Sequence, residues 1–278
     1  MPRNNQDRLV GNKKPEDESS PIQSDNPLLN FVIPTEFVAL PTKGKFYPKE
    51  HPLHDAESIE IKYMTAKETD LLTSKTLLKK GVAVDRMLQS VILDKNIQVK
   101  DLYVGDKNSI MMATRISGFG NLYRGTITCR SCGTVSEEEF DLSEVKVKEI
   151  DETIEYSDNG TFFVTLPRTK VTAELKLLTG DDESRVMKKT EKKKKLNLPE
   201  SMLTDLLKAI IVSINTVTER SAVEEFIDVM PALDAKHIRD EYDKMRPDVD
   251  LSYQFECGTC ESINDINIPF SVNFFWPD

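Results

Sequence analysis

The chain has 278 residues, of which 38 % are hydrophobic and 30 % are charged, and its net charge at pH 7 is −10. This length can bury one sizeable core or two smaller ones. There is no apolar run of about 18–20 residues, so no membrane-spanning helix is expected. The N-terminus has no apolar signal core, so we expect a cytoplasmic protein that is not secreted. An acidic chain also lacks the positive charge from which non-specific nucleic-acid binding draws most of its affinity.

The N-terminal part is predicted to be a disordered tail followed by an extended arm. Residues 1–30 are rich in Asn, Asp, Glu, Ser, Lys and Pro, and they have too little apolar surface to offset the entropy of ordering. In residues 31–64, prolines exclude a long helix, whereas the apolar residues are too dense for a free linker. We therefore expect an arm that lies on a surface, turns at Gly44 and ends in a short strand.

Residues 65–120 are predicted to be a helical segment. Thr65 and Glu68 have the spacing of a capping box, in which each side chain bonds the backbone N–H of the other residue. The helix that they begin is expected to run to about Lys80, because a glycine follows there. Two further helices are indicated by Leu, Met, Val and Ile at helical spacing, at residues 84–93 and 104–116.

Residues 121–179 are predicted to hold a first cysteine pair and a strand meander. Alternating apolar and polar residues before Cys129 and after Cys132 indicate a strand on each side of this pair. Further strand signals, separated by turn residues, occur at residues 153–156, 161–166 and 171–178. Together they predict a meander of about four strands that begins at the cysteine pair.

Residues 180–250 are predicted to be a helical insertion. Its first helix ends in the run Lys188–Lys195. That run is either a solvated helix end or a surface for an acidic partner or a nucleic-acid backbone. Pro199 opens the clearest helix, whose apolar stripe continues through Ile214.

Residues 251–278 are predicted to hold a second cysteine pair and an aromatic end. Strand signals flank Cys257 and Cys260 just as they flank the first pair. Three aromatic residues close the chain and either form an exposed docking patch or pack on the neighbouring strands: Phe274, Phe275 and Trp276.

The two Cys-x-x-Cys pairs, Cys129/Cys132 and Cys257/Cys260, use every cysteine of the chain. Two intervening residues let both sulfurs of a pair reach one ion at about 2.3 Å, and two such pairs are typical of a zinc ribbon. Residues 133–256 separate the pairs, whereas an ordinary ribbon has roughly 15–20 residues there. A shared Zn²⁺ would therefore tie the end of the chain to its middle. Two local disulfides, or thiols without a ligand, are the alternatives.

The predicted fold class is α+β, with helical segments around an antiparallel strand meander and a discontinuous four-cysteine zinc ribbon. Four thiolates fill the tetrahedral shell of zinc, which predicts a structural ion and not a catalytic one. The sequence contains no nucleophile elbow, P-loop or Rossmann fingerprint, and its three histidines offer little for acid/base chemistry. We therefore predict an interaction protein without enzymatic activity or a small-molecule substrate.

The alternative function is a zinc-ribbon regulator that binds nucleic acid through Lys188–Lys195. The acidic net charge opposes this interpretation, and so do cysteine pairs whose intervening residues include only one base, Arg130.

Four stretches of the chain resemble proteins of T4-type contractile phage baseplates. Residues 40–48 (LPTKGKFYP) are similar to the LPSKGxFYP opening of those proteins, with Thr42 where Ser is usual. Residues 59–68 (IEIKYMTAKE) are similar to their I-x-I-x-x-M-T-x-x-E continuation. Residues 102–107 (LYVGDK) and the closing residues 274–277 (FFWP) match the same pattern. The resemblance covers roughly residues 35–278 and leaves out the N-terminal tail.

The resemblance implies a component of the central hub of the tail baseplate, or a factor in its assembly. Other hub proteins would be its partners. Its location would be the host cytoplasm during assembly, and the tail baseplate of the virion if the protein stays there. The candidate contact residues lie in the arm and at the aromatic end: Lys43, Gly44, Phe46, Tyr47, Phe274, Phe275 and Trp276.

Overall fold

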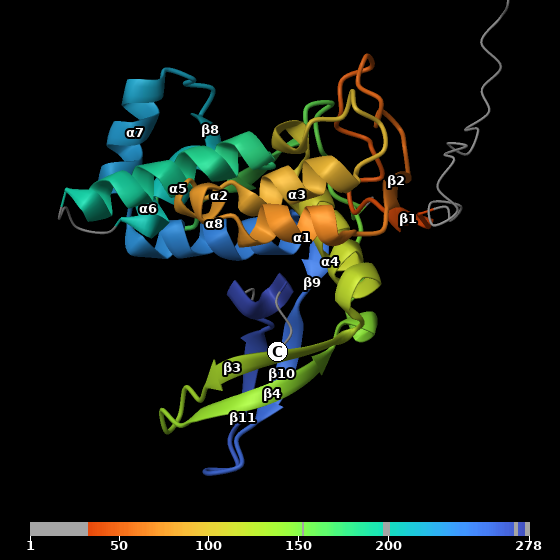
Figure 1. The fold of residues 1–278 in the computed structure, drawn as a ribbon. Helices are drawn as coiled ribbons and strands as arrows, with labels where there is room; N and C mark the ends of the chain where they lie inside the picture. Colours follow the sequence, from red (N-terminus) through yellow and green to blue (C-terminus); the bar gives the residue numbers. More distant parts are fainter. Residues whose placement is uncertain (1–32, 152, 197–200, 270–271, 276–278) are drawn as a thin grey trace, which may run out of the picture. The chain divides into compact units, whose positions relative to one another are not determined.

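The computed structural model describes the chain in four stretches, residues 33–151, 153–196, 201–269 and 272–275. The predicted disordered tail, residues 1–30, lies outside them, and so does Trp276. Helices and antiparallel strands follow one another along the chain, so the predicted α+β class is confirmed (Figure 1).

The strands of the described residues form five small antiparallel sheets. Four sheets are pairs: β1 (Thr35–Ala39) with β2 (Ser58–Lys62), β3 (Leu122–Thr128) with β4 (Val135–Asp141), β5 (Lys146–Lys148) with β9 (Asp248–Asp250), and β10 (Ser252–Glu256) with β11 (Ile263–Asn267). The fifth has three strands, β6 (Thr161–Thr165), β7 (Thr172–Lys176) and β8 (Ile211–Ile214).

The predicted meander over residues 121–179 is wrong as a single sheet. Its strands belong to three separate sheets, and residues 153–156 form no strand. The reason is that β5 and β7 take partners from far along the chain, β9 and β8 respectively. Strand signals read in chain order show where strands lie, but they do not show such distant pairings.

Eight helices lie in the described residues, and none of them is long and apolar enough to cross a membrane. Their bounds are α1 (Ala66–Thr73), α2 (Lys75–Lys79), α3 (Ala83–Val91), α4 (Val104–Phe119), α5 (Gly180–Lys195), α6 (Met202–Ile210), α7 (Arg220–Val229) and α8 (Ala232–Met245). Short 3₁₀ turns are η2 (Val99–Asp101), η3 (Leu142–Glu144) and η4 (Val272–Phe275). The helix predicted to run to Lys80 is interrupted at Ser74, whose backbone is extended (φ −63°, ψ 108°).

The apolar stripe predicted to be helical through Ile214 changes structure part-way. Helix α6 ends at Ile210, and the residues after it pair with β7 as strand β8, with Leu175 opposite Ile211 and Ala173 opposite Ile214. Isoleucine and valine are β-branched and fit a pleated sheet at least as well as a helix. The available edge of β7 therefore decides the structure here.

The predicted arm folds back on itself as the β1–β2 pair. The loop between these strands turns at Gly44, as predicted, with φ of +70°. A Cβ atom at Gly44 would lie 2.3 Å from the carbonyl oxygen of Leu53, so the position accepts only glycine.

The predicted capping box at the start of α1 is confirmed. The carboxylate of Glu68 accepts hydrogen bonds from the backbone N–H and the hydroxyl of Thr65. It also accepts from Lys62 and Ser90, and it is fully buried. Burial raises the pKa of Glu68, but the hydrogen bonds from Lys62, Ser90 and Thr65 outweigh it and lower the pKa to about 2.

Helix α4 contacts the backbone before β9 at its N-terminal end and the β3–β4 hairpin at its C-terminal end. At its N-terminal end, a Cβ atom on Gly105 would lie 2.2 Å from the carbonyl oxygen of Pro247, so the helix approaches the backbone before β9 very closely. Near its C-terminal end, Arg115 is buried. Its guanidinium donates to the carbonyl oxygens of Gly120 at the end of α4, Leu122 on β3 and Phe274 on η4. These bonds fix the β3–β4 hairpin to α4.

Candidate metal centre

The four cysteines lie at the tips of two hairpins that stand side by side, β3–β4 and β10–β11 (Figure 1). We call these two hairpins the ribbon. The structure brings all four sulfurs within 4.8 Å of one another: Cys129, Cys132, Cys257 and Cys260. All four thiols are free, so the local disulfides considered above are not formed.

The spacing of the sulfurs fits a tetrahedral ion. The Sγ atoms of Cys129 and Cys260 are 3.8 Å apart, and those of Cys132 and Cys257 are 3.7 Å apart. Four sulfurs placed tetrahedrally at about 2.3 Å from one Zn²⁺ would be about 3.8 Å from each other. Each close contact joins the first cysteine of one pair to the second cysteine of the other. One ion would therefore bind both hairpins.

The two cysteine loops have the same backbone structure. In each, the N–H of the first cysteine donates to the carbonyl oxygen five positions on, and its own carbonyl oxygen accepts from the N–H four positions on: Cys129 with Thr134 and Gly133, and Cys257 with Ser262 and Glu261. The residue four positions on has a positive φ in both loops, +75° at Gly133 and +57° at Glu261. One loop thus places glycine in the left-handed region, and the other forces a glutamate into it.

Hydroxyl groups face the sulfurs at equivalent positions of the two loops. The hydroxyl of Thr134 is 3.2 Å from Sγ of Cys132, and the hydroxyl of Ser262 is 3.1 Å from Sγ of Cys260. Hydroxyls that donate to metal-bound thiolates hold the ligands in position and adjust their basicity. These two residues were not predicted from the sequence. The signal was present, since both motifs read Cys-x-x-Cys-x-Thr/Ser.

The sulfur of Cys129 has several hydrogen-bonding neighbours. Ser262 Oγ lies 3.5 Å from it, and the side-chain amide of Asn264 donates to it at 3.6 Å. The Ser262 hydroxyl, followed by the backbone N–H of Cys132, lowers the pKa of the Cys129 thiol to about 5. A thiolate, the form that binds metal, is thereby favoured at neutral pH.

The centre is half inside the protein. Cys129 and Cys257 are 2 % exposed and pack in the apolar core with Ile127, Phe255 and Ile266, whereas Cys132 is exposed. An ion held by these sulfurs would therefore be anchored to the core on one side and close to solvent on the other.

A protein-family model matches residues 34–276, which is most of the chain, and it describes a T4 bacteriophage base plate protein. The chain belongs to this family. Comparisons with curated proteins and with solved structures give no match.

Two of the baseplate-family stretches meet at a buried carboxylate. Asp106, in the LYVGDK stretch, accepts from the backbone N–H of Thr42 at 3.0 Å and from its hydroxyl at 2.7 Å. It also accepts from the Tyr47 hydroxyl at 2.7 Å, and that hydroxyl accepts in turn from the N–H of Tyr103 at 3.1 Å. We call these four residues the Asp106 junction.

The Asp106 junction was not predicted from the sequence. Asp106 is fully buried, and this burial raises the pKa of its carboxyl although the Thr42 and Tyr47 donors act in the opposite direction. The available signal was an acidic residue in the first turn of a helix that begins between apolar residues. Such residues usually cap their own helix, so the distant donors could not be inferred.

The predicted contact residues mostly lie inside the protein. Four of them are between 2 % and 6 % exposed: Phe46, Tyr47, Phe274 and Phe275. Buried rings cannot meet a partner from the surface, so the structure gives these four a role in the core. Lys43 forms an ion pair with Glu149 at 2.7 Å, Gly44 forms the turn of the arm, and Trp276 is outside the described residues.

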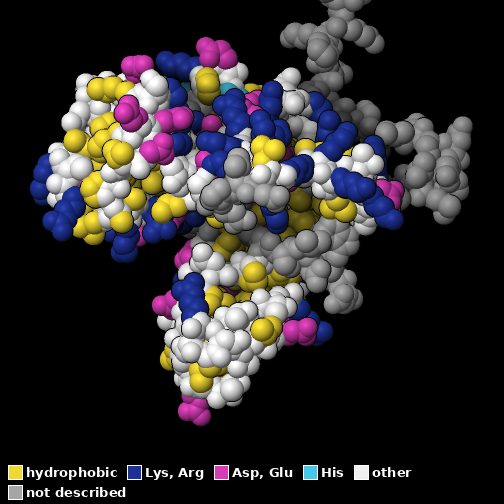
Figure 2. Space-filling view, turned by 90° about the vertical axis from the view of Figure 1, so that its left-hand side faces the viewer, with side chains coloured by type: hydrophobic (Ala, Val, Ile, Leu, Met, Phe, Trp, Pro, Cys, Tyr) yellow, Lys and Arg dark blue, Asp and Glu magenta, His cyan; other side chains and the backbone are white. Residues whose placement is uncertain are grey.

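The run Lys188–Lys195 contributes to the fold of this baseplate-family chain. Lys189 and Lys193 form ion pairs with Asp205, at 2.9 and 2.6 Å, and thereby join α5 to α6. Burial raises the pKa of Asp205, but the hydrogen bonds from Lys193 and Lys189 lower it to about 2. Figure 2 shows acidic and hydrophobic side chains among the Lys and Arg side chains of the helical part. Two lysines that a nucleic acid would contact are already paired, which argues against the nucleic-acid alternative.

Proposed function

We propose that the chain is a non-enzymatic component or assembly factor of the central hub of the phage tail baseplate. The match to the baseplate family over residues 34–276 carries this proposal. The expected partners are other baseplate hub proteins. The expected locations are the host cytoplasm during assembly and, if the protein stays in the particle, the tail baseplate of the virion.

We also propose that Zn²⁺ occupies the four-cysteine centre as a structural ion. The sulfur spacing supports zinc, because it matches the edge of a tetrahedral site made by four thiolates. Four thiolates leave no open position for a substrate or a reactive water, which supports a structural role. The ion would hold β3–β4 against β10–β11 and so give the ribbon a defined surface for its partners.

The hub proposal is tested by recovering the tagged full-length chain from infected cells at low and at high salt. Hub proteins should co-purify under both conditions, because a specific interface depends less on salt than phosphate binding does. Mass spectrometry of purified virions and of assembly intermediates then separates a resident component from an assembly factor. Recovery of nucleic acid that is lost at high salt, without any baseplate protein, would contradict the proposal.

The metal proposal has its own test. The protein purified without added metal should contain close to one zinc per chain by elemental analysis, and a thiol-reactive reagent should release it. A chain that is folded but free of metal would contradict the zinc assignment and would leave the hub proposal standing.

A further inference from the structure

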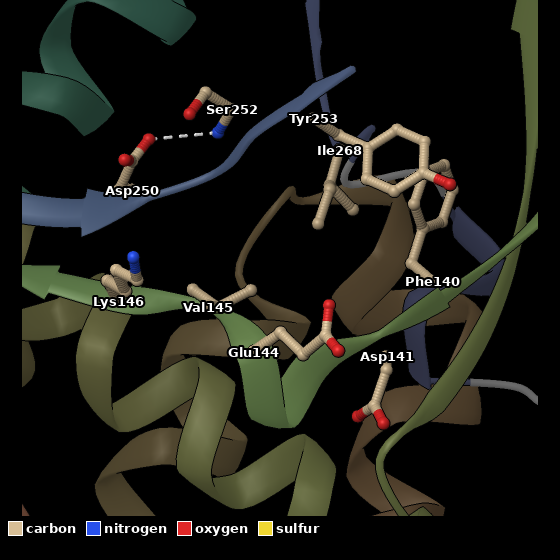
Figure 3. Close-up of a pocket in the computed structure, with 9 residues that line it drawn as sticks. All are labelled: Phe140, Asp141, Glu144, Val145, Lys146, Asp250, Ser252, Tyr253 and Ile268. Carbon is tan, nitrogen blue, oxygen red and sulfur yellow. Dashed lines mark hydrogen bonds between the residues drawn. The ribbon is translucent and has the colours of Figure 1, made fainter. Parts of the chain in front are cut away.

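A groove of about 540 Å³ lies where the ribbon joins the rest of the fold. Figure 3 shows the residues that line it. One wall is the segment from the end of β4 to β5, residues 140–146, and the other is the segment from β9 to β10, residues 250–253. Each wall continues into one of the two hairpins that carry the cysteines. Joining the hairpins through a metal would therefore also hold the two walls in place.

The groove has an apolar and aromatic lining. Phe140 and Ile268 are buried, while Val145 and Tyr253 are partly exposed to the groove. The rings of Phe140 and Tyr253 pack edge to face, with centroids 4.9 Å apart and an interplanar angle of 83°. This packing fixes the Tyr253 ring at one end of the groove, as Figure 3 shows.

The charges at the groove are mostly negative. Asp250 stands opposite Lys146 in the β5–β9 pair, so these two charges offset one another. Asp141 accepts hydrogen bonds from Asn121 and Ser143. Glu144 makes no hydrogen bond or ion pair with the described residues, and Figure 3 places its carboxylate between the apolar lining and Asp141. The groove therefore holds an exposed carboxylate, Glu144, and a tyrosine ring on the same lining, a combination that suits a cation with an apolar stem.

We propose that this groove binds an arginine side chain presented by a partner protein. The planar guanidinium can stack on Tyr253 and form two parallel hydrogen bonds with the Glu144 carboxylate. The aliphatic stem of the arginine covers Ile268 and Val145. Lysine offers neither the planar stacking nor the paired hydrogen bonds, and an acidic side chain is repelled by Glu144 and Asp141.

The arginine site goes beyond the proposed function, because it assigns the chemistry of the partner segment and not the identity of the partner. It holds or fails whether or not that partner belongs to the baseplate hub. Loss of hub co-purification with retained arginine selectivity would overturn the hub proposal alone.

The test is a binding titration of the metal-loaded full-length chain with fluorescein-labelled Gly-Leu-Arg-Leu-Gly, followed by fluorescence anisotropy. Matched peptides carry Lys or Glu in place of Arg. The Arg peptide should bind at least about threefold more tightly than the Lys peptide and about tenfold more tightly than the Glu peptide. Equal affinity for Arg and Lys, or no binding of the Arg peptide at millimolar concentration, would overturn the proposal.

Two variants with the same charge change locate the site. Glu144→Gln should weaken the Arg peptide about fivefold, whereas Glu137→Gln, on the exposed face of β4 outside the groove, should leave binding unchanged. Metal content and melting temperature of both variants show that they are folded. If both variants weaken binding of the Arg peptide equally, the effect is general electrostatic attraction to an acidic protein, and the proposal is overturned. Sedimentation that shows a dimer dependent on Glu144 would assign the groove to a second copy and would overturn it as well.

Discussion

The ribbon and the Asp106 junction both join segments that are far apart in the sequence, but they do so by different means. In the ribbon, four sulfurs converge on a site that suits one ion. At the junction, a single carboxylate takes donors from Thr42 and Tyr47 without any ion. Stability of the ribbon should therefore depend on metal supply, whereas stability of the junction should depend only on the chain itself.

Loss of one metal ligand should have the largest effect. Cys257→Ser should abolish stoichiometric zinc binding and lower the free energy of unfolding by about 5 kcal/mol or more, because the binding free energy of a structural zinc contributes directly to folding. Urea unfolding and elemental analysis measure both quantities. Thr259→Ala, an exposed position between the same two cysteines, is the control and should keep the metal. A Cys257→Ser variant that unfolds like the parent would show that the ribbon does not need an ion.

Removal of the junction carboxylate should have the next largest effect and should spare the metal. Asp106→Ala leaves the Thr42 N–H and the Tyr47 hydroxyl buried without an acceptor, which should cost about 3 kcal/mol. Denaturant unfolding measures the loss, and the zinc content should remain that of the parent. Asp101→Ala, an exposed carboxylate at the preceding turn, should change stability by no more than about 0.5 kcal/mol. Zinc loss in Asp106→Ala would show that the two regions are coupled.

The two cysteine loops differ in which residue adopts the left-handed conformation, Gly133 in one and Glu261 in the other, and this difference should be measurable. Gly133→Ala should destabilise the protein by about 1 kcal/mol, because alanine resists the φ of +75° although space is available. Glu261→Gly should stabilise it by up to about 1 kcal/mol for the same reason. Gly258→Ala is the control, because its Cβ atom would meet nothing within 4 Å and its φ is not positive. Thermal unfolding at fixed zinc concentration tests all three.

The smallest expected effect is the pH dependence of stability, which should have opposite signs for Glu68 and Asp106 because their pKa values are shifted in opposite directions. Because the pKa of Glu68 is lowered to about 2, its ionised form stabilises the fold above its usual pKa of 4.5, and this contribution is lost as the pH falls through 2. Glutamine keeps the capping box, but its amide nitrogen cannot accept from Lys62 and Ser90, so Glu68→Gln should cost about 1 kcal/mol at pH 7. The stability difference between parent and variant should shrink on acidification. Parent and variant carry the same four cysteines, so the effect of cysteine protonation on stability is the same in both and drops out of the difference.

Asp106 should show the opposite sign. Its pKa is raised above the usual 3.8, so its contribution is fully present at lower pH and is lost as the pH rises through the raised value. The stability difference between the parent and Asp106→Asn should therefore increase on acidification, as followed by urea unfolding. The same slope for both variants would contradict the assigned environments.

Local chemistry was readable from the sequence wherever one short motif specifies one structure. The Cys-x-x-Cys pairs, the Thr65–Glu68 capping box and the turn at Gly44 need only neighbouring residues to define their geometry. The family resemblance rests on short stretches of the same kind and is confirmed by the family match. Most helices were also placed correctly, because an amphipathic repeat carries its own period.

Other features depended on partners that are remote in the chain. Whether Ile211–Ile214 is helix or strand depends on the free edge of β7, and whether Phe46 and Phe274 are docking groups or core residues depends on what covers them. Among the described residues Glu144 has no ion-pair partner, while Asp205 is held by two lysines. Neither state can be read from the residues next to these two carboxylates in the chain.

The candidate metal ligands, the α+β class and the baseplate family can be read from the order of the residues, since each is encoded in short-range spacing. The sheet pairings, the buried carboxylate of the Asp106 junction and the groove beside the ribbon follow only from how distant segments pack. The physical reason is that hydrogen-bond partners and burial are properties of pairs of segments, and a pair exists only when the chain has folded.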